Sequence, residues 1–208
     1  MEACLKDTIM LDLDGVIRHW SDVEVNNAER ELGIAVGTLY SFASSQELSS
    51  LATIGAISHD EWCGRIRTAL SSEYDENIAE QLVSAWYTAS CEIDFTLLDK
   101  IKRLAPMSKL VLVTNATSRL TADLDKVNLL SRFDVVVNSS TIGVAKPDPK
   151  FFEKALALSE SQAAHTVFVD DKLSNVHAAS SLGIESFHHQ SVVDTLEFIR
   201  KRFTSTAV

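Results

Sequence analysis

Short runs of consecutive apolar residues recur along the chain and predict strands that are buried on both faces. A strand with one face in water alternates apolar and polar residues, whereas a strand inside a parallel sheet is apolar throughout. The runs of the second kind are Thr8 to Leu11, Leu110 to Val113, Val135 to Val137, Val167 to Val169 and the shorter Ile184 to Ser186. We therefore expect a parallel sheet with one strand near the N-terminus and four in the second half of the chain.

Apolar residues at helical spacing lie between the later strands and predict helices there. These helices carry Phe95, Leu98 and Ile101 before Pro106, then Leu120, Leu124 and Val127, then Pro149 to Leu158, then Ser174 to Leu182 before Gly183, and finally Val193, Leu196 and Ile199. Strands that alternate with helices in this way indicate an α/β fold. The expected architecture is a doubly wound parallel sheet with helices on both faces.

Residues 20–92 follow a different pattern, without a recognisable strand. The tetrapeptides that begin at Ser21 and Ser58 fit the capping box that starts a helix, and apolar residues recur behind them at helical spacing. The block is longer than a crossover between parallel strands requires. We interpret it as a small helical cap domain (20–92) inserted into an α/β core domain (1–19 and 93–208). A cap inserted after the first strand would cover the carboxyl edge of the sheet, where doubly wound folds bind ligands.

Composition narrows the possible partners and surroundings. A net charge of -10 argues against nucleic-acid binding, which needs a basic surface. The three cysteines, Cys4, Cys63 and Cys91, lack the spacing of a zinc site or a disulfide framework, so we expect ordinary thiols in a reducing compartment. The N-terminus lacks the features of a signal peptide, and no apolar run is long enough to span a membrane. The expected protein is cytoplasmic, with no membrane partner.

Polar residues follow the longer strands at the points where they end. They are Asp12 and Asp14 before Gly15, Thr114-Asn115, Lys146-Pro147 after the third strand and its loop, and Asp170-Asp171. Because parallel strands end at the same edge, these groups are expected to meet there. They supply acids for a divalent cation, a hydroxyl and an amide for an anion, and one positive charge. Metal-dependent phosphoryl transfer needs that set of groups.

These motifs resemble those of the haloacid dehalogenase superfamily, in order and spacing, over essentially the whole chain. The matching motifs are Asp12-Leu-Asp14-Gly15, Val113-Thr114-Asn115, Lys146-Pro147, and Asp170-Asp171 with Asn175. The predicted insertion resembles the small helical cap of the subgroup that includes sugar-phosphate phosphatases, phosphoglycolate phosphatases, beta-phosphoglucomutase and the phosphatase half of soluble epoxide hydrolase.

The resemblance implies a Mg²⁺-dependent phosphatase that hydrolyses a small phosphomonoester, such as a sugar phosphate, through an aspartyl-phosphate. Asp12 would be the nucleophile, and Asp14 would protonate the leaving group and then activate water. The remaining implied roles are Mg²⁺ ligation by Asp12, the backbone carbonyl of Asp14, Asp171 and Asp170, phosphate binding by Thr114 and the Asn115 amide, and charge compensation by Lys146.

Each motif also has a plainer interpretation. Carboxylates before a glycine are compatible with a strand-end turn, and a lysine is most often a solvated surface charge. We further expect Arg18, His19 and Trp20 to line the substrate entrance, with Arg18 able to meet a second anionic group; a hinge with surface charges is the alternative. The aromatic residues Tyr40, Phe42, Trp62 and Trp86 fit either substrate contact or core packing.

Several other functions remain compatible with the same residues. A phosphomutase of the beta-phosphoglucomutase type would return the phosphate to a sugar. A haloacid dehalogenase also attacks with an aspartate, but Asp14 and the Asp170-Asp171 pair count against it. In a phospho-acceptor signalling module the acidic pair comes first in the chain, whereas here it comes last. A binding protein on the same fold would show substituted catalytic positions, and none is substituted. The physiological substrate and the oligomeric state stay open.

Overall fold

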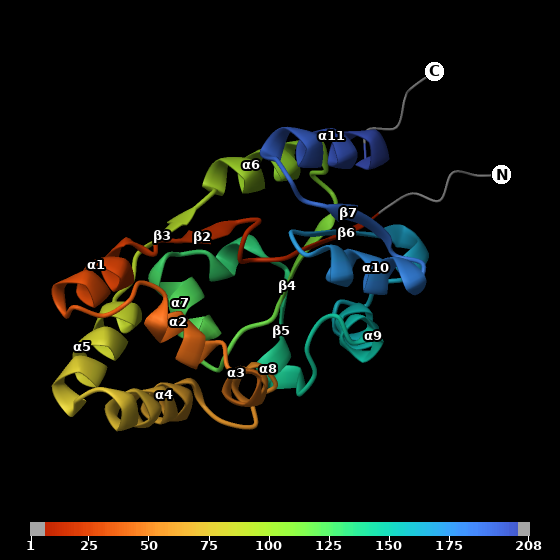
Figure 1. Ribbon diagram of the computed structural model, residues 1–208. Coiled ribbons are helices and arrows are strands. Elements are labelled where there is room, and N and C mark those ends of the chain that lie inside the picture. The colour runs from red at the N-terminus through yellow and green to blue at the C-terminus, as the bar shows by residue number, and fades with distance from the viewer. Residues whose placement is uncertain (1–6, 204–208) are drawn as a thin grey trace, which may run out of the picture.

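A five-stranded parallel sheet forms the centre of the computed structural model, which describes residues 7–203 (Figure 1). The strand order is β5-β4-β1-β6-β7, with every neighbouring pair parallel. The strands are β1 (Thr8–Leu11), β4 (Lys109–Thr114), β5 (Val135–Asn138), β6 (Thr166–Asp170) and β7 (Glu185–His188). The N-terminal strand therefore lies between two strands from the second half of the chain. The predicted fold class is confirmed, and the five strands agree with the apolar runs to within about two residues.

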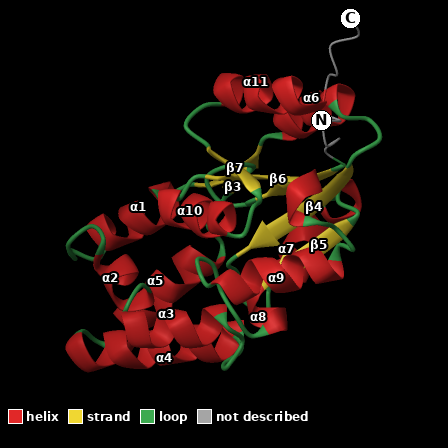
Figure 2. Ribbon diagram, turned by 90° about the vertical axis from the view of Figure 1, so that its right-hand side faces the viewer, coloured by secondary structure: helices red, strands yellow, loops and turns green. Residues whose placement is uncertain are grey.

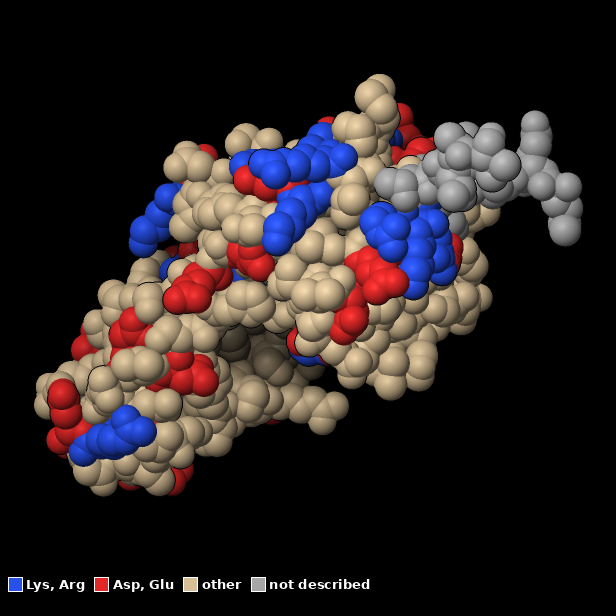
Figure 3. Space-filling view, turned by 90° about the horizontal axis from the view of Figure 1, so that it is seen from above, with Lys and Arg blue, Asp and Glu red and all other residues tan. Residues whose placement is uncertain are grey.

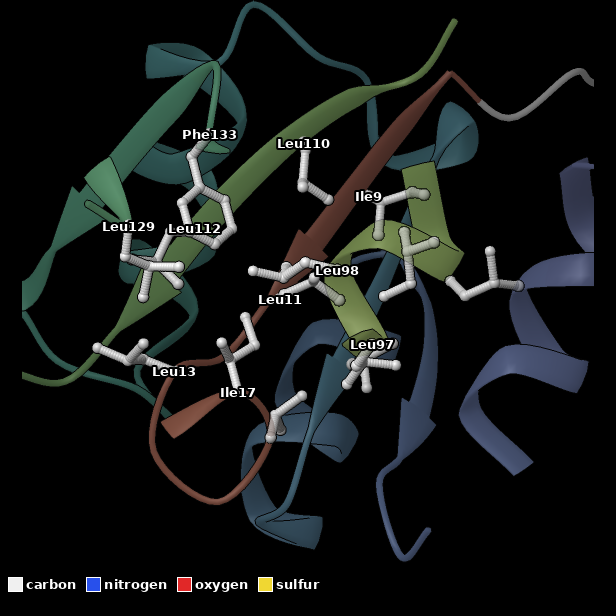
Figure 4. Close-up of a cluster of buried hydrophobic side chains, with 14 of the residues drawn as sticks. Ile9, Leu11, Leu13, Ile17, Leu97, Leu98, Leu110, Leu112, Leu129 and Phe133 are labelled. Atoms are coloured by element: carbon white, nitrogen blue, oxygen red, sulfur yellow. The ribbon is translucent and has the colours of Figure 1, made fainter. Parts of the chain in front are cut away.

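Each face of the sheet is covered by helices, because successive side chains of a strand point to opposite faces. Ile9 and Leu11 belong to one buried cluster and Met10 to another. The first cluster packs under α6 (Phe95–Leu104), α7 (Leu120–Lys126) and α11 (Val192–Phe203), and the second under α9 (Pro149–Leu158) and α10 (Leu173–Ser181). Figures 1 and 2 show α6 and α11 side by side, and Figure 4 shows side chains of β1 and α6 in the first cluster. The described part of the chain contains no helix long and apolar enough to cross a membrane.

The chain between the first strand and α6 folds into five helices with a hydrophobic cluster of their own. We call this part the helical segment; its helices are α1 (Val23–Glu31), α2 (Thr38–Ala43), α3 (Gln46–Thr53), α4 (His59–Glu73) and α5 (Glu76–Tyr87). Glu29 is fully buried and accepts from the backbone amides of Gly37 at 2.7 Å and Leu39 at 2.8 Å. Its carboxylate thereby satisfies free amides at the start of α2, where Gly37 adopts a φ of 94°.

Two short strands correct the expectation that residues 20–92 contain no strand. β2 (Arg18–Trp20) and β3 (Cys91–Ile93) pair antiparallel where the chain enters and leaves the helical segment. Three residues are too few to show a period, so the apolar pattern could not reveal them. The capping box at Ser58 is confirmed, since its hydroxyl accepts from the Glu61 amide at 3.1 Å.

The capping box at Ser21 is wrong, and its groups tie together the two ends of the helical segment. Asp22, rather than Ser21, occupies the N-cap position of α1, and the Asp22 side chain makes no capping hydrogen bond; the Ser21 hydroxyl accepts from the Val23 amide at 3.2 Å instead of from the Glu24 amide. The Ser21 hydroxyl donates to Glu24 at 2.9 Å, and Glu24 also accepts from the Ser90 hydroxyl at 2.5 Å. Within the helical segment, α4 (His59–Glu73) packs on α5 (Glu76–Tyr87), and α5 packs on α1. These three helices therefore form one packed unit.

One shorter helix and two 3₁₀ turns complete the described connections. They are α8 (Ser139–Ile142), η1 (Leu130–Arg132) and η2 (Ala163–His165), with α8 following β5 directly and contacting α3 (Gln46–Thr53) of the helical segment. Seen from above, basic and acidic side chains intermingle over α6 and α11, and the surface is hollowed between the part that carries the helical segment and the rest (Figure 3).

Candidate active site

The carboxyl ends of β1, β4 and β6 bring the predicted residues to one edge, because β1 pairs with both other strands. Leu11 lies opposite Leu112 and Val169, and the Asp12 amide donates to the Val169 carbonyl at 2.9 Å. Asp12, Thr114 and Asp170 therefore leave the sheet at nearly the same level. Asp12 is 6% exposed, Thr114 1% and Asp170 0%. Carboxylates buried in this way need a partner or a cation.

Lys146 is the partner, and it is buried too. Its ammonium lies 2.8 Å from Asp12 Oδ1 and 2.7 Å from Asp170 Oδ2, and donates to the Val113 carbonyl at 2.9 Å. An ammonium has three donors, so all three are used by these groups. The plain interpretation of Lys146 as a solvated surface charge is wrong.

Asn115 clamps the loop that carries Lys146. Its side-chain nitrogen donates to the Lys146 carbonyl at 2.8 Å, and its side-chain oxygen accepts from the Lys146 amide at 2.8 Å. The sequence suggested a phosphate contact through the Asn115 backbone amide, and it did not reveal this side-chain role. An amide that satisfies both backbone groups of one residue fixes that residue's position relative to β4. The phosphate contact stays a prediction.

Three acids at this edge form a group that suits a metal ion. Asp12, Asp170 and Asp171 each have a carboxylate oxygen within 4.8 Å of the others. Asp170 is also held by the Asn175 side-chain nitrogen, at 3.0 Å from both oxygens, and by the Lys172 amide at 2.7 Å. By contrast, Asp171 Oδ1 is buried and has no hydrogen-bond partner in the described structure. A buried carboxylate oxygen without a partner, in a group of hard oxygen ligands, fits Mg²⁺.

Gly15 makes room for this acidic group. A Cβ added to Gly15 would lie 2.5 Å from Asp171 Oδ2, and the glycine has a φ of +87°, which other residues rarely adopt. The turn after Asp14 therefore passes so close to Asp171 that only glycine fits.

Burial raises the pKa of two of these three acids, Asp12 and Asp171. Loss of solvent is the main cause that raises the pKa of Asp12 to about 6; the Lys146 ammonium opposes this shift and the Asp170 carboxylate adds to it. Burial also raises the pKa of Asp171, and Asp170 acts in the same direction. Three acids and one ammonium leave an excess of negative charge, which a divalent cation would compensate.

Asp14 lies outside the group of three acids and is held by other side chains. Arg18 donates to both of its oxygens, from Nε at 2.7 Å and Nη2 at 2.9 Å, and the Trp20 indole nitrogen donates at 2.9 Å. The Arg18 guanidinium also lies 4.5 Å from the centre of the Trp20 ring. Arg18 and Trp20 do line the cavity described next, whereas the exposed His19 is not among its lining residues. Arg18 uses its Nε and one Nη2 donor on Asp14, and its contact with a second anionic group stays a prediction.

A cavity of about 260 Å³ lies between the helical segment and the carboxyl edge of the sheet. Asp14 and Asn115 belong to its wall, so it adjoins the acidic site. The other lining residues include five aromatic side chains, Trp20, Tyr40, Trp62, Trp86 and Tyr87. Phe42, which the sequence grouped with them, packs instead against the hydrophobic cluster of the helical segment.

His59 links the helical segment to the loop after β4, a contact that the sequence did not predict. Its Nδ1 lies 3.0 Å from the Thr117 hydroxyl, and its backbone amide donates to the Ser118 hydroxyl at 3.0 Å. Burial, with the nearby Arg119 guanidinium, lowers the pKa of His59. The capping box at Ser58 places His59 in the first turn of α4. It was the one feature of the sequence that could have drawn attention to His59.

Comparison with known proteins finds one relative that is similar over most of this chain and one that is similar over a short stretch of it. Phosphoglycolate phosphatase of Pseudomonas syringae pv. tomato is 28% identical over 198 residues, covering 86% of this chain and 68% of that protein. The sesquiterpene phosphatase astK of Aspergillus oryzae is 45% identical over 56 residues, covering 27% of this chain and 29% of that protein. The second match thus spans less than two thirds of the relative's length.

Solved structures share the fold. A HAD family enzyme from Bacteroides thetaiotaomicron, in complex with magnesium and inorganic phosphate, has a TM-score of 0.67 at 20% identity and covers 89% of this chain and 94% of its own. The family model described as haloacid dehalogenase-like hydrolase matches residues 9–188. This range includes all residues of the five-stranded sheet except Thr8, and all four motifs, so the predictions of the family and of a hydrolase are confirmed. The chain belongs to the haloacid dehalogenase-like hydrolases.

Proposed function

We propose that the protein is a Mg²⁺-dependent phosphatase that hydrolyses a small phosphomonoester through an aspartyl-phosphate. The observation that carries this proposal is the position of Asp12, a buried carboxylate between the Lys146 ammonium and two further acids. A structural ion pair would need one acid and one base. Two additional carboxylates at the same place repel each other and destabilise the protein when no cation is bound. A divalent cation would compensate their charge and would also bind the anionic phosphoryl group of a substrate.

Mg²⁺ would be held by Asp12, Asp171 and Asp170 together with the backbone carbonyl of Asp14. The unpartnered Asp171 Oδ1 supports this assignment. Bound there, the cation would offset negative charge on the transferring phosphoryl group and reduce its repulsion from the carboxylates. The Lys146 ammonium, 2.8 Å from Asp12, would also offset negative charge on the phosphoryl group.

The chain's own residues would perform two successive displacements at phosphorus. Asp12 forms a bond to phosphorus while the bond to the leaving alcohol oxygen breaks, and Asp14 gives that oxygen a proton. Asp14 then takes a proton from water, which attacks phosphorus and restores the free Asp12 carboxylate. The Thr114 hydroxyl and the Asn115 amide would hold the phosphoryl oxygens during both steps.

The helical segment would act as a cap over this chemistry, with residues 20–92 as its proposed extent. Its His59 contacts the loop that follows β4, and its helix α3 contacts α8, the helix that follows β5. Asp14 is positioned by Arg18 and Trp20 at the boundary between the cap and the core, on the path of the leaving alcohol. A cap at this position excludes water until the leaving group has departed.

Release of p-nitrophenol from p-nitrophenyl phosphate tests the proposal. We expect hydrolysis with Mg²⁺, none with EDTA, and a loss of more than about a thousandfold in Asp12→Asn. Asp125→Asn, which changes an exposed acid of α7, is the matched control and should keep full activity. If the folded protein releases no p-nitrophenol with Mg²⁺, or if Asp12→Asn is as active as the control, the proposal is wrong. Transfer to a sugar instead of water would indicate a phosphomutase.

The names of the two curated relatives imply leaving groups of opposite polarity. Phosphoglycolate carries a second anionic group on a short chain, whereas a sesquiterpene is a hydrocarbon. Neither substrate transfers to this chain by similarity. The choice between polar and apolar leaving groups therefore depends on the cavity of this protein.

A further inference from the structure

The cavity beside Asp14 is the place where the leaving group of the proposed reaction has to lie. Asp14 and Asn115 line it on the core side, and the helical segment lines it on the other. The phosphoryl group would be held at Asp12, and Asp14 would protonate the ester oxygen. What that oxygen carries must then extend away from the sheet, into the cavity. The side chains that line the cavity therefore indicate which chemical class of leaving group fits there.

Aromatic rings from four separate elements of the chain contribute to this wall. Trp20 comes from β2, Tyr40 from α2, Trp62 from α4, and both Trp86 and Tyr87 from the end of α5. The Trp62 and Trp86 rings meet edge to face with their centres 4.9 Å apart. His59 lies 5.9 Å from Trp62 and 5.8 Å from Tyr87, measured between ring centres. The rings of Trp62, Trp86 and Tyr87 are thus joined through contacts with one another or with His59, and they present a preformed apolar surface.

The charged side chains of the wall are already paired with one another. Arg18 binds both oxygens of Asp14. Arg119 lies 2.7 Å from Asp123, and its guanidinium is 4.3 Å from the centre of the Tyr87 ring. Among the described residues of this wall, both guanidinium groups thus have carboxylate partners. A second carboxylate or phosphate on the substrate would therefore meet guanidinium groups whose charge is already balanced by a carboxylate.

Two of the five aromatic side chains use their polar groups within the protein. The Tyr40 hydroxyl donates to Asp22 at 2.9 Å, and the Trp20 indole nitrogen donates to Asp14. In the described structure, the indole nitrogen of Trp62 is a buried donor without a partner. The side-chain polar groups of Trp62, Trp86 and Tyr87, which make no hydrogen bond in the described structure, are fewer than the hydroxyl groups of a hexose phosphate, so part of a sugar would lose its hydrogen bonds to water on entry.

We propose that the substrate is the monophosphate ester of a hydrophobic alcohol, with its hydrocarbon chain in the aromatic cavity beside Asp14. This inference rests on the proposed phosphatase function. It narrows the substrate class away from sugar phosphates and from phosphoesters with a second anionic group.

The size of the cavity sets the length of chain that it can bury. An apolar cavity of about 150 Å³ holds benzene, with six carbon atoms. By that proportion, the cavity of about 260 Å³ holds a chain of about ten carbons. Each methylene buried contributes about 0.8 kcal/mol, which is up to about fourfold in kcat/KM. Carbons beyond the tenth would remain in solvent and add little.

A series of unbranched alkyl monophosphates from ethyl to dodecyl, each below its micelle concentration, tests the inference. We expect kcat/KM to rise by up to about fourfold per methylene and to level off near ten carbons. Glucose 6-phosphate and phosphoglycolate should be poorer substrates than octyl phosphate. If p-nitrophenyl phosphate is hydrolysed but the alkyl series is flat, or a polar substrate is preferred, the inference is wrong and the phosphatase stands. If no phosphomonoester is hydrolysed, the phosphatase itself fails.

Substituting a residue that lines the cavity tests whether the cavity causes the preference for long alkyl chains. Tyr40→Ala removes one ring and should lower the ratio of kcat/KM for octyl over ethyl phosphate by about tenfold, the contribution of roughly two methylenes. Tyr40→Phe keeps the ring and should restore the ratio. Phe95→Ala is the matched control, since Phe95 and Tyr40 are both 38% exposed and Phe95 lies on α6, outside the cavity. Circular dichroism verifies that each variant is folded. An unchanged ratio in folded Tyr40→Ala would overturn the assignment.

Discussion

Removing the charge of Asp12 should stabilise the metal-free protein even though it abolishes the proposed activity. Asp12 is 6% exposed, and burial raises its pKa from 3.8 to about 6. The fold therefore favours the protonated form relative to the unfolded chain. As the pH rises through the window from 3.8 to about 6, the unfolded carboxyl ionises first, and the free energy of unfolding falls. Above that window the folded protein carries a charge that costs about 3 kcal/mol.

Asp12→Asn removes this charge and keeps an oxygen that can accept from Lys146. Without metal, we expect its free energy of unfolding at pH 7 to exceed that of the wild type by about 1 to 3 kcal/mol. At pH 5 the wild-type carboxyl is mostly protonated, so the advantage should shrink by about 1.4 kcal/mol. The comparison between the two proteins cancels the titration of all other groups.

Urea denaturation in EDTA at pH 5 and pH 7 measures these differences. Asp125→Asn, at an exposed site, should stay within about 0.5 kcal/mol of the wild type at both pH values. Added Mg²⁺ should stabilise the wild type and Asp125→Asn, but not Asp12→Asn, if Asp12 is a ligand. The reasoning fails if metal-free Asp12→Asn is less stable than the wild type at pH 7, or if its advantage is the same at pH 5.

Three further substitutions separate the other roles at the site. Lys146→Met leaves two buried carboxylates without their cation and should lower the free energy of unfolding by about 3 to 5 kcal/mol, measured in urea. Arg18→Lys cannot reproduce the two-pronged contact with Asp14 and should lower kcat by about tenfold, while calorimetric Mg²⁺ affinity is unchanged because Asp14's carboxylate lies outside the acidic group. Gly15→Ala pushes a methyl group onto Asp171 and should lower Mg²⁺ affinity by at least about tenfold.

Matched variants elsewhere in the chain control for the substitution itself. Lys150→Met changes an exposed lysine, Arg65→Lys an exposed arginine with an ordinary helical ion pair, and Gly64→Ala a glycine with no atom within 4 Å of an added Cβ. All three should behave like the wild type. A loss of Mg²⁺ affinity in Arg18→Lys, or unchanged affinity in Gly15→Ala, would contradict the division of roles between Asp14 and Asp171.

The sequence by itself determined the sheet and the meeting of its polar strand ends. The apolar runs are local, and a strand buried on both faces has no other pattern, so β1, β4 and β6 could be placed from their residues alone. Parallel strands share one carboxyl edge, which brought Asp12, Thr114 and Asp170 together before any contact was known. The order of the motifs then indicated the family.

Contacts between distant parts of the chain decided the rest. Asn115 clamps Lys146 across 31 positions of the chain, and the two short strands β2 and β3 pair across the whole helical segment. The fork from Arg18 to Asp14 spans only four residues, yet nothing in the local pattern tells which way either side chain turns.

The aromatic cavity also depends on tertiary structure, because its rings belong to helices whose apolar residues serve mainly as core. Trp62 and Trp86 recur at the same helical spacing as Ile66 and Leu82, which are fully buried. The helical spacing of apolar residues alone predicts that all four side chains are buried in the core. Only the packing of α4 on α5 against the carboxyl edge of the sheet separates the rings that face Asp14 from those that close the core, since that packing joins surfaces far apart in the sequence.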